Sequence, residues 1–191
     1  MKMTMTMCQR VMALILLGLM MMTVVSCGEG GYGHNAYNFL ADAEQICNLL
    51  ADSIHEGCYY TLANDSLFRD WMFANATGCP EDEIEKAVSQ IGVPSSPVEA
   101  IHLVLCVYEN TGVISKLDRA LLEAKQELEM LISEQPENKE YPKLKEYYGK
   151  LVSYSEFLKS AHYSFDDFVV AVQVSEKEIR DCRAELDLDF G

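Results

Sequence analysis

Residues 97–133 have the sequence PVEAIHLVLCVYENTGVISKLDRALLEAKQELEMLIS, which carries the clearest structural signal in the chain. Ser96 and Glu99 form a capping box around Pro97, a pattern typical of the start of a helix. Beyond Pro97, one set of positions recurs at alternating intervals of four and three residues, as in helices that pack along a seam. This spacing predicts one helix over about 97–133, with room for a kink at Gly112. The seam positions are Leu103, Val107, Asn110, Ile114, Leu117, Leu121, Ala124, Leu128 and Leu131.

A second stretch without proline follows the polar loop at 134–141 and repeats the same spacing. Its seam runs from Leu144 to Val172 and resumes at Ile179 and Leu186, with Glu176 and Arg183 as polar interruptions. Two long helices joined by a short loop must lie antiparallel. Residues 97–133 and 142–187 are therefore predicted to form a long helical hairpin.

Three shorter helices are predicted N-terminal to the hairpin and are expected to cover its apolar surface. The first spans 35–57, where apolar residues follow the helical period, and is predicted to end at Gly57. The second is predicted after 64–66, and the third between Pro80 and Gly92. The predicted fold class is thus all-α, a small helical bundle over residues 35–191.

The chain has 191 residues, with 15 basic and 30 acidic side chains and a formal net charge of -15. Residues 1–26 contain no acid, so the remainder carries 13 basic and 30 acidic residues, a net charge of -17. An apolar content of 49% is too high for a fully disordered chain. The excess of acid argues against nucleic acid as a partner, because phosphate binding needs a basic surface.

The first 26 residues have the three parts of a secretory signal peptide. Lys2 and Arg10 supply positive charge, and the fifteen residues from Val11 to Val25 contain no charge. As a helix they would span about 22 Å, which is short of the roughly 30 Å hydrocarbon core. The alternatives are an uncleaved membrane anchor and a buried helix of the fold.

Val24-Val25-Ser26-Cys27 resembles the lipobox of bacterial lipoproteins, in which an aliphatic residue, a variable residue and a small residue precede cysteine. The resemblance covers residues 1–27. It implies that Cys27 is lipidated with acyl chains such as palmitate and becomes the first residue of the mature protein. Two or more acyl chains anchor a protein stably. Residues 27–34 are then the lipidated cysteine and a glycine-rich tether, and the expected location is a bacterial membrane, facing the periplasm or the cell surface.

Seven cysteines occur, of which Cys8 leaves with the signal peptide and Cys27 is the expected lipidation site. Among the other five, Cys58 and Cys79 flank the predicted second short helix and could close its loop with a disulfide. The alternative is that all five are small buried apolar residues.

Aromatic side chains are concentrated in residues 147–168. Tyr147, Tyr154 and Tyr163 lie off the predicted seam of their helix, so they could form an exposed groove for a peptide or a glycan. The alternative, which we favour, is that the shorter helices cover these rings.

The sequence shows no nucleophile elbow, phosphate-binding loop or dinucleotide fingerprint, and its four histidines are dispersed. We therefore expect no catalytic residues, no cofactor and no metal site. The predicted function is a non-catalytic interaction or accessory module of the cell envelope, anchored to the membrane through Cys27, with a protein or other envelope component as partner. The alternatives are an acidic inhibitor or immunity-type protein that binds a basic target and, third, an enzyme with an unrecognised site.

Overall fold

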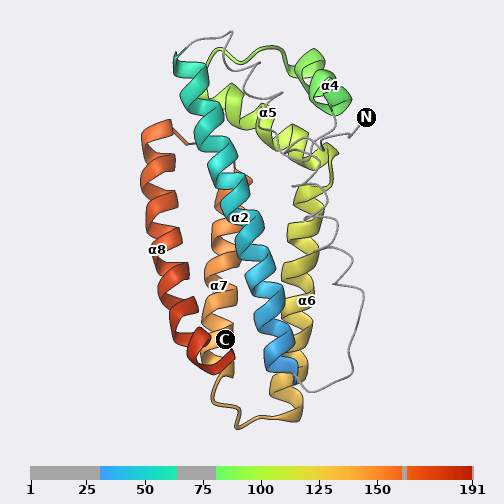
Figure 1. The fold of residues 1–191 in the computed structure, drawn as a ribbon, viewed down its shortest axis with the longest axis vertical. Coiled ribbons are helices and arrows are strands. Elements are labelled where there is room, and N and C mark those ends of the chain that lie inside the picture. Colours follow the sequence, from blue (N-terminus) through green and yellow to red (C-terminus); the bar gives the residue numbers. More distant parts are fainter. Residues whose placement is uncertain (1–30, 64–80, 161–162, 191) are drawn as a thin grey trace, which may run out of the picture.

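The computed structural model describes residues 31–63, 81–160 and 163–190, and it confirms an all-α bundle. The described residues contain helices and no strand. Figure 1 shows the long helices arranged side by side, with the shorter helices across one end. The helices are α2 (Tyr32–Ala63), α4 (Glu81–Ile91), α5 (Pro97–Asn110), α6 (Val113–Glu134), α7 (Tyr141–Leu158) and α8 (Phe165–Phe190).

Helix α2 is the longest described helix and lies at the centre of the bundle, in contact with α5, α6, α7 and α8. It was predicted to span 35–57 as a short covering helix, but it has 32 residues. Gly57 lies inside it and is buried, because Cys58 and Thr61 continue the buried face for another turn. The burial of that face outweighs the cost of one helical glycine, about 1 kcal/mol.

The start of α2 also shortens the predicted tether, since Tyr32, Gly33 and His34 belong to its first turn. Gly33 is buried, and a Cβ atom at this position would lie 3.4 Å from the ring of Phe190. The glycine therefore lets the end of α8 approach the start of α2 closely.

The predicted helix over 97–133 is two helices, α5 and α6, which meet at an angle (Figure 1). The capping box at Ser96 is confirmed, since the Glu99 amide donates to Ser96 Oγ. Gly112 separates the helices with φ of +76°, in the left-handed region. The prediction of one helix is therefore corrected: the chain turns at Gly112, where a kink was allowed, and the seam spacing continues across that turn.

The predicted helix over 142–187 is also two helices, and α8 turns back to pack along α7 and α2. The new helix is capped by Ser164, whose hydroxyl accepts from the Asp167 amide at 3.2 Å and donates to the Asp167 carboxylate at 2.7 Å. The antiparallel hairpin therefore consists of α6 and α7, joined by residues 135–140, and it is half as long as predicted.

None of the helices in the described ranges combines the length and the apolar character that a membrane span requires. The predicted signal peptide, the lipobox and the predicted short helix after 64–66 lie outside those ranges.

Gly112 and Gly149 provide a matched pair of tests for this backbone description. No atom lies within 4 Å of a Cβ built at either position, so neither substitution causes a clash. Gly112→Ala is expected to destabilise the domain by about 1 kcal/mol, because alanine is strained at positive φ. Gly149→Ala, in the middle of α7, is expected to stabilise it by about 0.5–1 kcal/mol. Urea unfolding measures the free energy of unfolding of both variants. An equal change in the two variants would contradict the turn at Gly112.

Candidate functional site

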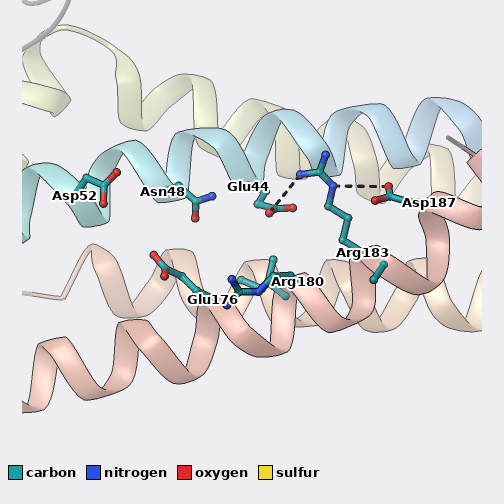
Figure 2. A pocket seen from close by; sticks show the side chains of 9 residues that line it. Glu44, Asn48, Asp52, Glu176, Arg180, Arg183 and Asp187 are labelled. Atoms are coloured by element: carbon teal, nitrogen blue, oxygen red, sulfur yellow. Dashed lines mark hydrogen bonds and ion pairs between the residues drawn. The ribbon is translucent and has the colours of Figure 1, made fainter.

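A polar groove of about 460 Å³ lies between α2 and α8 (Figure 2). Helix α2 contributes side chains at intervals of four residues, which places them on one face of the helix. Helix α8 contributes side chains at intervals of three and four residues, which also share a face. The lining residues are Glu44, Asn48 and Asp52 of α2, and Glu176, Ile179, Arg180, Arg183, Ala184 and Asp187 of α8.

Aromatic contacts join the two helices at both ends of the groove. At one end the rings of Tyr37 and Phe190 stack with their centroids 5.4 Å apart. At the other end the rings of His55 and Phe165 lie 5.5 Å apart. The helices are therefore antiparallel neighbours whose polar side chains face each other between two aromatic contacts.

Two tyrosines of α7 reach the groove from the core. Tyr147 and Tyr154 are 0% and 1% exposed. The hydroxyl of Tyr147 donates to Glu44 Oε2, and that of Tyr154 donates to Glu176 Oε1 at 3.5 Å. Burial raises the pKa of both tyrosines, and the adjacent carboxylates raise it further, so both hydroxyls stay protonated at physiological pH.

Arg183 connects the two walls. Its Nη1 lies 3.5 Å from Glu44 Oε1, and its Nε lies 3.7 Å from Asp187 Oδ1. Tyr37 donates a hydrogen bond to the same Asp187 oxygen. Glu44 is only 8% exposed, so these partners compensate for the burial of its charge.

Three other groove residues remain available to bind a ligand. Asp52 and Arg180 are exposed and Asn48 is half-buried, and none of them has a hydrogen bond or ion pair to another described residue. Figure 2 shows Arg180 beside Glu176 on α8, with Asp52 and Asn48 on the opposite wall. The groove thus has a fixed inner network and a set of unpaired polar groups at its mouth.

Tyr147 and Tyr154 are core residues, which agrees with the favoured prediction that these rings are covered and not with the alternative of an exposed groove. Tyr163 is half-buried, with its ring 4.5 Å from that of Phe157. Tyr147 contacts Glu44 of α2, one of the helices expected to cover these rings, whereas Tyr154 contacts Glu176 of α8, which was predicted to continue the same helix as α7. Once α8 folds back, α7 is covered on a second face, and that face carries Tyr147 and Tyr154.

The cysteines in the described ranges do not gather at the groove. Cys47 and Cys58 are buried, and burial raises the pKa of each thiol to about 12. The Cys58 thiol lies 3.5 Å from the carbonyl oxygen of Pro97. Cys79 and Cys27 lie outside the described residues, so the bridge between Cys58 and Cys79 and the lipidation of Cys27 stay predictions.

Within the described part of the chain, no three histidine, cysteine or acidic side chains are placed to hold a metal ion. His55 is exposed beside Phe165, and His162 lies outside the described residues.

Comparisons with protein-family models, with curated proteins and with solved structures found no match to this chain.

Tyr147→Phe tests the inner network of the groove. The change removes the hydroxyl that donates to the buried Glu44 and is expected to destabilise the domain by about 1–3 kcal/mol. The matched control is Tyr148→Phe, one residue along α7, where the side chain is half-buried and the expected effect is small. Urea unfolding measures both, and equal stability of the two variants would mean that the Tyr147 bond contributes nothing.

Proposed function

We propose that this protein is a bacterial lipoprotein whose helical domain is a non-catalytic binding module, with the groove between α2 and α8 as its binding site. The observation that carries the proposal is the contrast within the groove. Glu44, Arg183 and Asp187 bind one another or tyrosine hydroxyls, whereas Asp52 and Arg180 face the solvent without an ion pair to a described residue. Unpaired charges on a rigid support are suited to recognising a charged ligand.

Membrane attachment is supported by the sequence around Cys27. The short apolar run and the lipobox precede a glycine-rich stretch, and the described domain begins within a few residues of it. A lipid on Cys27 would hold the groove close to a membrane surface, where it would meet components of the cell envelope.

The arrangement of charges favours binding over catalysis. Acid–base and nucleophilic catalysis need a reactive group that is held by an orienting partner and open to the substrate. In the groove the firmly held carboxylate, Glu44, already accepts from Tyr147 and Arg183. The open groups, Asp52 and Arg180, have no orienting hydrogen bond from the described residues.

The test is a pull-down from envelope extracts with the full-length, lipidated protein. Arg180→Gln is expected to reduce retention of the bound component, whereas Lys177→Gln, an exposed change on the same helix, is expected to retain it. Equal retention by the two variants would overturn the groove as the binding site. Turnover of ester, peptide, glycan or phosphate substrates that a single groove substitution abolishes would replace the proposal with an enzyme.

A second candidate, an acidic inhibitor or immunity-type protein, is supported by the outer face of α7 and α8. Lys143 and Lys150 pair with Asp189 and Glu178 at 2.9 and 2.7 Å. Around them, a smaller groove of about 210 Å³ leaves three acids without an ion pair to a described residue, namely Glu146, Asp181 and Glu185.

Salt dependence separates the two candidates. Attraction between an acidic protein and a basic target is screened by salt, so binding that collapses at about 0.5 M salt and on Asp181→Lys favours the second candidate. Binding that survives salt better and depends on Arg180 favours the groove.

A further inference from the structure

We propose that the groove between α2 and α8 binds a short linear zwitterion of dipeptide length. Its ammonium group would lie between Asp52 and Glu176, and its carboxylate would lie at Arg180. This inference rests on the proposed function, because it names the ligand class of the same groove.

The charged side chains of the groove that are not paired with one another indicate the chemical class of the ligand. Four carboxylates and two guanidinium groups line the groove. Glu44, Asp187 and Arg183 pair with one another in the inner network, which keeps one net negative charge. Two carboxylates and one guanidinium are left, and Glu176 has only one of its two oxygens in a long hydrogen bond to Tyr154. A ligand that complements them needs both a cationic and an anionic group.

The positions of these groups assign each end of the ligand to a different part of the groove. Figure 2 shows Asp52 and Glu176 on opposite walls at one end of the groove, with Arg180 further along α8. An ammonium group donates three hydrogen bonds, and a site between two carboxylates accepts them. A guanidinium binds a carboxylate with two parallel hydrogen bonds. The ligand is therefore oriented along the groove.

The spacing of Glu176 and Arg180 along α8 indicates the length of the ligand. Glu176 and Arg180 are four residues apart on α8, which corresponds to about 6 Å along the helix axis at 1.5 Å per residue. An extended dipeptide spans about 7 Å, at 3.3–3.6 Å per residue, so it matches this separation better than a single α-amino acid, which is about half as long.

Asn48 supports a peptide group in the middle of the ligand. Figure 2 places Asn48 between Asp52 and Glu44 along α2, next to the gap between the two charged ends. Its amide has a donor and an acceptor, which is what a peptide N–H and C=O require. The volume of about 460 Å³ lies within the range of small-molecule sites.

The experiment is calorimetric titration of the full-length protein, purified in detergent, with diglycine. Glycine, N-acetyl-diglycine and diglycine amide are the comparison ligands, since each lacks the length or one of the charges. We expect diglycine to bind at least about tenfold more tightly than any of the three, since each comparison ligand loses charge-assisted hydrogen bonds at one end of the groove. Equal affinities for diglycine and its blocked forms would overturn the proposal.

Two variants assign the ends. Arg180→Gln is expected to abolish the preference for diglycine over diglycine amide. Asp52→Asn combined with Glu176→Gln is expected to abolish the preference for diglycine over N-acetyl-diglycine. The control is Lys177→Gln, which is exposed on α8 outside both grooves and should keep both preferences. Unchanged preferences in the groove variants would place the ligand elsewhere.

The same variants separate this inference from the proposed function. If diglycine does not bind but Arg180→Gln still loses the envelope component, the ligand class is wrong and the groove remains the binding site. If neither diglycine nor an envelope component depends on the groove, both proposals fail.

Discussion

Leu121→Asp is expected to unfold the helical domain. Leu121 is 7% exposed and lies on α6, which packs against α2 and α7. A carboxylate at this position would be buried without a partner, and such changes cost about 3–5 kcal/mol or more. Since small domains are stable by about 5–15 kcal/mol, we expect a large fall in the thermal midpoint or a chain that does not fold. Circular dichroism during heating measures the effect.

Leu122→Asp is the matched control, because Leu122 follows directly on the same helix and is 54% exposed. The same chemical change should alter stability by no more than about 0.5 kcal/mol there. If Leu121→Asp kept the thermal midpoint of the unchanged protein, the seam of α6 would face water and the bundle described here would be incorrect.

The sequence predicted the fold class because helical periodicity is a local property. The seam through Leu117, Leu121 and Leu128 identifies the buried face of α6, and all three side chains are buried. The same periodicity did not reveal where one helix ends and the next begins. Leu158 and Phe165 are both seam positions, so the pattern continues through a reversal that the capping residues Ser164 and Asp167 mark only weakly.

The groove left a partial signal in the sequence. Glu176 and Arg183 occupy seam positions of α8, where an apolar residue would be expected, and both line the groove. A polar residue in a seam indicates a helix face with polar partners. The identity of those partners was beyond the sequence, because Glu44 and Arg183 are separated by 139 residues and meet only once α8 has folded back along α2.

Cys27→Ser is expected to abolish lipidation and to leave the signal peptide attached. The proposed resemblance to bacterial lipoproteins implies that the Cys27 thiol forms a thioether with the lipid and that the matching peptidase cuts only the lipidated precursor. The serine variant should therefore keep residues 1–26 and incorporate no labelled palmitate. Mass spectrometry of the purified protein and fatty-acid labelling in a bacterial host measure the two effects.

Cys8→Ser is the matched control, because Cys8 lies within residues 1–26 and outside the Val24-Val25-Ser26-Cys27 motif. This variant should be lipidated and cleaved like the unchanged protein, which separates the role of Cys27 from a general effect of losing a thiol. Labelled fatty acid on the Cys27→Ser protein would show that another residue carries the lipid. Cleavage without label in the unchanged protein would show that residues 1–26 are an ordinary signal peptide, and the domain would then be released from the membrane instead of held at its surface.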